Sequence, residues 1–168
     1  MANSLNITIA QLNPIVGDVS GNLELARGAL AQARQEGSDL LVFSELFLLG
    51  YPPEDLVLKP RVAEVCAEAL FSLHAELLAT DPAILIGAPY REDVHVYNSA
   101  FLLQHGENAQ RWDKHELPDY GVFDDSRVFT KGELKSPCFD LKGVRVGVAI
   151  CEDIWYRTVP EAIRADGA

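Results

Sequence analysis

The chain has 168 residues, 48% of them hydrophobic and 23% charged, which is ordinary for a globular domain with a buried core. Its formal net charge of -11, from 14 Lys and Arg against 25 Asp and Glu, argues against a surface for nucleic acid or anionic membrane. The three cysteines are odd in number and widely spaced, the four histidines have no metal-ligand spacing, and no secretory signal or membrane span is visible. We therefore expect a cytoplasmic protein without a disulfide framework, a metal site, a nucleic-acid partner or a membrane segment.

The first half of the chain alternates between strand and helix patterns. The predicted elements are, in order, a strand over residues 5–12, a helix over 21–35, a strand over 39–43, a helix over 61–78 and a strand over 83–88. Gly37 is placed to end the first helix, and the turn around Pro52 and Pro53 can continue neither a helix nor a strand. This order predicts an α/β fold with parallel neighbouring strands.

The second half changes to short strands joined by turns. The predicted elements are strands over 94–103, 109–113, 137–141 and 144–150, and a helix over 160–165 capped by Thr158. The first two of these strands read as an antiparallel hairpin added to the sheet. The long irregular segment 114–135 is of a length that is usually functional or disordered in compact domains.

Three polar residues follow predicted strands: Glu45, Lys114 and Cys151. Brought together at the carboxyl edge of one sheet, they would supply a general base, a cation for a developing oxyanion and a nucleophile, which is enough for acyl transfer. Each also has a purely structural interpretation, as a solvated loop acid, a surface charge and a packing thiol respectively. Cys66 and Cys138 fall in predicted regular elements and are expected to be packing residues.

Four segments carry a resemblance to a known family. They are AQLNPIVGDVSGN at residues 10–22, FSELFLLGYPPEDL at 43–56, KHELPDYGVFDDSRVF at 114–129 and GVAICEDIW at 147–155. In these motifs the chain resembles the nitrilase, or carbon-nitrogen hydrolase, superfamily, and most closely its branch of glutaminase domains from glutamine-dependent NAD synthetases. The resemblance implies a nitrilase-like α-β-β-α sandwich, of which residues 1–168 would be the N-terminal part. Asp125 stands where this branch usually has Glu, and Lys131-Gly132 where Pro-Gly is common.

The same resemblance implies roles for the residues that match its motifs. Glu45, Lys114 and Cys151 would be the catalytic set: the thiolate attacks the side-chain amide of glutamine, the ammonium and the Glu152 backbone N–H stabilise the oxyanion, and the carboxylate transfers protons.

Four further residues, namely Tyr51, Tyr120, Phe123 and Glu152, match positions that line the substrate pocket in this branch. Of these, Glu152 would hold the α-ammonium group of glutamine. Tyr120 as a turn residue and Glu152 as a solvated acid at a helix entry are the structural alternatives.

The resemblance also implies partners. Glutamine would be the substrate, and ammonia would pass to a C-terminal synthetase domain, outside this chain, that uses ATP and Mg²⁺ to amidate deamido-NAD. No cofactor is implied for the present domain, and a homo-oligomer is expected. Two alternatives stay open: a stand-alone amidase or carbamoylase of the same superfamily, and a catalytically inactive fragment with a packing thiol.

Overall fold

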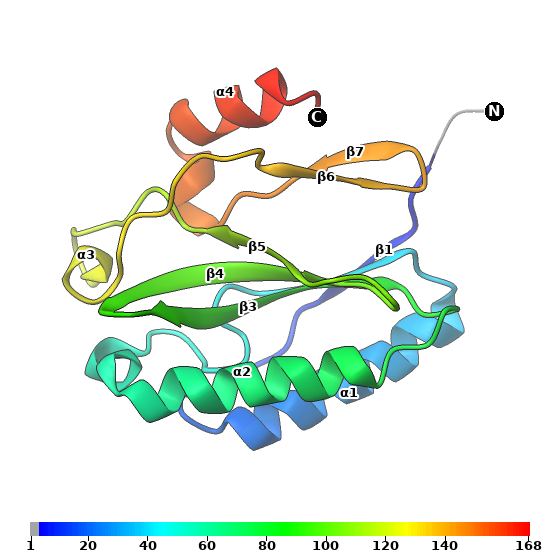
Figure 1. Ribbon diagram of the computed structural model, residues 1–168, viewed down its shortest axis with the longest axis horizontal. Coiled ribbons are helices and arrows are strands. Elements are labelled where there is room, and N and C mark those ends of the chain that lie inside the picture. The colour runs from blue at the N-terminus through cyan, green and yellow to red at the C-terminus, as the bar shows by residue number, and fades with distance from the viewer. Residues whose placement is uncertain (1–3) are drawn as a thin grey trace.

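The computed structural model describes residues 4–168 and arranges them as successive layers of helix, sheet, sheet and helix (Figure 1). Helices α1 (Val19–Glu36) and α2 (Pro60–Ala75) lie on one face of a five-stranded sheet. A two-stranded sheet lies over the opposite face, and helix α4 (Thr158–Ala165) lies beyond it. The predicted α-β-β-α sandwich is confirmed.

The larger sheet has the strand order β1-β2-β3-β4-β5. Its strands are β1 (Ile7–Ala10), β2 (Leu40–Phe43), β3 (Ala83–Glu92), β4 (His95–Leu103) and β5 (Gln110–Asp113). The first three are parallel, as the alternation of strands and helices predicts, and the last three pair antiparallel. Strand β3 continues beyond its predicted end at residue 88, because it pairs with β4 as far as Glu92 opposite His95.

Local chemistry fixes the ends of helix α1. The Asp18 carboxylate accepts a hydrogen bond from the Gly21 N–H at 2.9 Å, so the helix begins before the predicted residue 21. Gly37 ends it in the left-handed region at φ 65°, as expected. The buried faces of α1 and α2 pack on the sheet through Ala26, Leu30, Ala33, Cys66, Leu70 and Leu73. Cys66 is thus a core residue, as predicted.

The second sheet corrects the expectation that Glu45, Lys114 and Cys151 lie at the edge of one sheet. Strands β6 (Cys138–Leu141) and β7 (Val144–Gly147) pair only with each other among the described residues, so Cys151 does not follow a strand of the larger sheet. Strand β7 also ends before the predicted residue 150, because the Ile150 N–H bonds the Asp153 carboxylate at 2.9 Å instead of a neighbouring strand. A second apolar cluster joins the sheets through Leu40, Ala83, Ala100, Leu102, Phe139, Val148 and Ile150.

Short helices complete the chain. They are the 3-10 helices η1 (Glu54–Leu58) and η2 (Cys151–Ile154) and the single-turn helix α3 (Asp125–Val128), which lies within the long segment predicted to be irregular. Thr158 is not the cap of α4, since Arg157 already has helical angles and its carbonyl accepts from the Glu161 N–H. In residues 4–168 no helix combines the length and apolar character needed to cross a membrane.

Two glycines provide a matched test of the packing. A Cβ on Gly87 would lie 2.4 Å from the Leu46 backbone nitrogen, whereas one on Gly28, in α1, meets nothing within 4 Å. We expect Gly87→Ala to lower the free energy of unfolding by about 1–3 kcal/mol through overpacking, and Gly28→Ala to raise it by about 0.5–1 kcal/mol through helix propensity. Chemical denaturation of both variants measures the difference, and equal effects would contradict the close approach at Gly87.

Candidate active site

Glu45 lies in the tight turn that follows strand β2. The next residue, Leu46, has a left-handed φ of 49°, which costs energy in a residue with a side chain and turns the chain sharply. Gly87 of β3 lies under this turn, and its carbonyl accepts from the Leu48 N–H at 3.1 Å. The Glu45 side chain is 15% exposed and therefore lies in a fixed, partly desolvated position.

Lys114 follows strand β5 and has no exposed surface, so its interpretation as a surface charge is wrong. Its Nζ donates to Glu45 Oε1 at 2.6 Å and to Asp125 Oδ2 at 2.7 Å. Burial lowers the pKa of Lys114, but the charges and hydrogen bonds of these two carboxylates outweigh it, and the pKa is raised overall. The site therefore holds a permanent ammonium at neutral pH.

Asp125 accounts for how Lys114 is held despite its departure from the usual glutamate of the branch. It is the first residue of α3 and is 5% exposed. Its N–H donates to the Pro118 carbonyl at 3.0 Å, which fixes this helix against the preceding loop. Its second oxygen, Oδ1, accepts from the Tyr51 hydroxyl at 3.2 Å. Burial, followed by the charge of Asp125, raises the pKa of Tyr51.

Asn98, which the sequence analysis did not identify, also belongs to the site. It is 1% exposed on strand β4, and its Nδ2 donates to Glu45 Oε1 at 2.7 Å. Its backbone carbonyl accepts from the Lys114 N–H at 2.8 Å. Its own Oδ1 is buried and has no hydrogen-bond partner. No motif marked this residue, because its role depends on pairing between strands rather than on its neighbours in sequence.

Cys151 begins helix η2 with a left-handed φ of 48°, so the thiol stands on a sharp, strained turn. Cys151 is exposed, and with Glu45 it lines a cavity of about 110 Å³ between the two sheets. The pKa of the thiol is raised, first by partial burial and then by the Glu45 charge, while Lys114 and the Glu152 N–H act in the opposite direction. The resting group is therefore a thiol that needs a base.

Three of the residues expected to bind substrate lie together. Glu152 directly follows Cys151 and is 5% exposed, and its two carboxylate oxygens accept from the Tyr120 hydroxyl at 2.9 and 3.0 Å. The Phe123 ring meets the Tyr120 ring edge-on, with centroids 5.7 Å apart. Tyr51 lies apart from this group, against Asp125 on the Lys114 side. Glu152 is therefore not a solvated acid, and its carboxylate is held by Tyr120.

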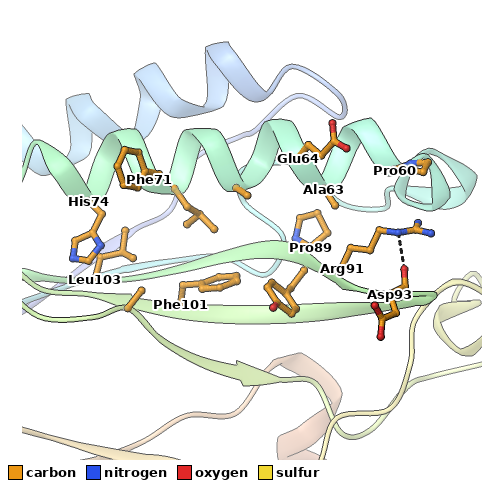
Figure 2. Close-up of a pocket in the computed structure, with 14 residues that line it drawn as sticks. Pro60, Ala63, Glu64, Phe71, His74, Pro89, Arg91, Asp93, Phe101 and Leu103 are labelled. Atoms are coloured by element: carbon orange, nitrogen blue, oxygen red, sulfur yellow. Dashed lines mark hydrogen bonds between the residues drawn. The ribbon is translucent and has the colours of Figure 1, made fainter.

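A larger apolar groove of about 540 Å³ lies elsewhere, between α2 and strands β3 and β4 (Figure 2). Its walls include Phe71 and His74 of α2 and Phe101 and Leu103 of β4, with Arg91 near one end. It contains none of the three predicted catalytic residues, and His74 already bonds the Gln104 carbonyl at 2.8 Å. Size alone therefore does not locate the chemistry in this molecule.

Comparison with known proteins places this geometry in a family. A family model described as carbon-nitrogen hydrolase matches residues 6–168. The chain belongs to this family. It is 40% identical over 168 residues to the glutamine-dependent NAD(+) synthetase of Rhodobacter capsulatus, covering 100% of this chain and 30% of that protein. The resemblance that the motifs indicated is thereby confirmed.

Solved structures agree with the family assignment. The glutamine-dependent NAD+ synthetase of Acinetobacter baumannii, in complex with ADP, superposes with a TM-score of 0.89 at 33% identity, covering 96% of this chain and 30% of that one. An amidase from Nesterenkonia sp. superposes with a TM-score of 0.86 at 26% identity, covering 100% of this chain and 64% of that one. The present chain therefore spans about a third of the length of the synthetases it is similar to.

The charges around Cys151 predict that two substitutions shift its pKa in opposite directions. Replacing Lys114 with Met should raise the pKa of Cys151 further, because a stabilising positive charge is lost, and Glu45→Gln should lower it, because a negative charge is lost. The rate of iodoacetamide labelling against pH, read on the Cys151 peptide by mass spectrometry, measures both shifts. Cys66, whose pKa burial raises to about 12, is the internal control. Shifts of the same sign in the two variants would contradict the arrangement.

Proposed function

We propose that this chain hydrolyses glutamine to glutamate and ammonia through a thioester on Cys151. The observation that carries the proposal is the buried Lys114 ammonium, which bonds Glu45 while Glu45 shares a cavity with the Cys151 thiol. The contact of Lys114 with Glu45 and the cavity that Glu45 shares with Cys151 support roles for these residues as cation, base and nucleophile. A mutant of the Nesterenkonia sp. AN1 amidase shows covalent addition of the acetamide moiety of fluoroacetamide at its active-site cysteine, which supports covalent chemistry at a cysteine in this fold.

The first step forms the tetrahedral intermediate. Glu45 takes the proton of Cys151, and the thiolate adds to the side-chain carbonyl carbon of glutamine. The Lys114 ammonium and the Glu152 backbone N–H stabilise the negative charge that develops on the carbonyl oxygen. Because Lys114 is already desolvated and held by two carboxylates, it needs no reorganisation as this charge forms.

The second step releases ammonia. Glu45 returns its proton to the departing amine, the C–N bond breaks, and the glutamyl group remains on Cys151 as a thioester. Glu45 then removes a proton from water as its oxygen adds to the thioester carbon. The C–S bond breaks, glutamate leaves, and Glu45 returns the proton to the Cys151 sulfur, which restores the free thiol. Asn98, bonded to Glu45 Oε1, would hold the carboxylate in one orientation through these proton transfers.

Glutamine recognition is assigned to the group next to the thiol. The Glu152 carboxylate would bind the α-ammonium group, with Tyr120 orienting it and Phe123 forming part of the wall. Tyr51 would line the opposite side. The Tyr120 hydroxyl is shared between the two carboxylate oxygens of Glu152 and would fix their orientation toward an ammonium ligand.

The ammonia would be consumed by an ATP- and Mg²⁺-dependent synthetase domain that amidates deamido-NAD. The names of the relatives support this, and the share of their length that this chain spans leaves room for such a domain in those proteins. A cytoplasmic homo-oligomer is part of the same proposal.

A stand-alone amidase is the second candidate, supported by the structural similarity to the Nesterenkonia enzyme. Kinetics separate the two. A glutaminase should release ammonia from glutamine with a kcat/KM well above that for butyramide, because Glu152 offers a partner for the α-ammonium group that butyramide lacks. Glu152→Gln should reduce the glutamine value and leave butyramide nearly unchanged. The reverse preference would favour the amidase.

The nucleophile assignment is tested in the natural full-length protein. Cys151→Ala should reduce glutamine-fed NAD synthesis by at least about 10³-fold, because the covalent route is lost, while ammonium-fed synthesis stays within about twofold. Both assays are run on the same folded preparation. A parallel loss of the two activities, or continued use of glutamine, would show that Cys151 is not the glutaminase nucleophile.

A further inference from the structure

Asp153 lies two residues after Cys151 and is 3% exposed. Its Oδ1 accepts from the backbone N–H groups of His115, at 3.0 Å, and Glu116, at 2.8 Å. Its Oδ2 accepts from the Ile150 N–H at 2.9 Å. One buried carboxylate therefore accepts from three backbone donors, and these donors come from two separate parts of the chain.

The two parts belong to different sheets. Ile150 precedes the Cys151 turn and follows β7 of the small sheet, whereas His115 and Glu116 follow β5 of the large sheet, directly after Lys114. Because no strand ladder joins the sheets in residues 4–168, side-chain contacts set the position of one against the other. Apolar packing is non-directional, so hydrogen bonds have to fix the register between the two turns.

The Lys114 segment is already anchored to its own sheet on the other side. The Lys114 N–H donates to the Asn98 carbonyl at 2.8 Å, and its carbonyl accepts from the Gly132 N–H at 2.8 Å. The His115 ring bonds the Gly132 carbonyl, also at 2.8 Å. Gly132 lies so close to Asp113 that an added Cβ would be 2.3 Å from the Asp113 carbonyl oxygen. Asp153 links the backbone of this anchored segment directly to the thiol turn, in addition to the hydrogen bond that Tyr120 makes to Glu152.

We propose that Asp153 is a positioning residue, whose carboxylate ties the turn carrying Cys151 to the strand end carrying Lys114 and so sets the distance between nucleophile and cation. The inference rests on the proposed function for its activity readout. Asp153 does not line the cavity of Glu45 and Cys151, and all three of its hydrogen bonds go to backbone N–H groups, so we assign it no contact with the reacting atoms.

Two substitutions of Asp153 differ in the number of hydrogen-bond acceptors that they leave. Asp153→Ala removes the acceptors for all three donors. Asp153→Asn keeps the size and one carbonyl oxygen, so one of the two segments can still be bound while the other meets an NH₂ group, which cannot accept. If Asp153 acts by positioning the two segments, Asp153→Asn should retain part of the activity that Asp153→Ala loses.

In the natural full-length protein we expect Asp153→Ala to lower kcat for glutamine about 10²-fold with KM changed less than about threefold, since misplacement of catalytic groups by about 1 Å has this effect. Asp153→Asn should lie between alanine and the unaltered protein. The pH profile of Cys151 labelling by iodoacetamide should shift in the direction of the Lys114→Met profile, because the ammonium no longer lies at its set distance from the thiol.

Asp81→Ala is the matched control. The Asp81 side chain is 3% exposed, bonds the Leu78 N–H at 2.8 Å and pairs with Arg34, well away from the site residues. It should reduce thermal stability without moving the labelling profile or kcat. If Asp81→Ala shifts the profile as Asp153→Asn does, or if both Asp153 variants keep kcat and the profile, the proposal is overturned.

Folding and function are separated by the choice of readout. Should Asp153→Ala fail to fold, Asp153→Asn carries the test, with a circular dichroism spectrum recorded first. Should the unaltered protein release no ammonia from glutamine, the proposed function fails, yet the labelling profile still measures whether Asp153 sets the environment of Cys151. A normal profile in Asp153→Asn would then overturn the positioning role by itself.

Discussion

The buried ammonium of Lys114 is the constraint on which the rest of the site depends. A lysine without exposed surface carries a large desolvation cost, and it remains charged here because Glu45 and Asp125 both bond it. Removing one partner of such a group typically costs about 3–5 kcal/mol. The Lys114 ammonium therefore holds the turn after β2, the end of β5 and helix α3 in one arrangement. Its positive charge also suits an oxyanion.

This arrangement is built on strained and crowded backbone. Leu46 and Cys151 have left-handed angles next to or at the reactive groups, and Gly87 and Gly132 allow main-chain segments to approach where a Cβ would clash. Strain of this kind persists only where surrounding contacts over-determine it. Around this site those contacts are mostly directional hydrogen bonds, with apolar clusters on either side of the large sheet.

The small cavity and the larger groove beside α2 differ in the side chains that line them rather than in polarity. Both are lined mainly by apolar surface, but only the small cavity combines the Glu45 carboxylate with the Cys151 thiol. Glu152 directly follows Cys151 and accepts a hydrogen bond from the exposed Tyr120.

The sequence by itself determined the order of the elements, the layered α/β class and the identity of the polar residues at turns, because hydrophobic period, glycine and proline positions and local motifs act over a few residues. It placed Glu45, Lys114 and Cys151 after strands but assigned them to one sheet. Only the tertiary structure decided that two sheets meet there, that Lys114 is buried, and that Asn98, Asp125 and Asp153 take part. Lys114 and Asp125 are 11 positions apart and Asn98 and Glu45 are 53 positions apart, and such contacts arise from strand pairing and sheet packing that no local pattern encodes.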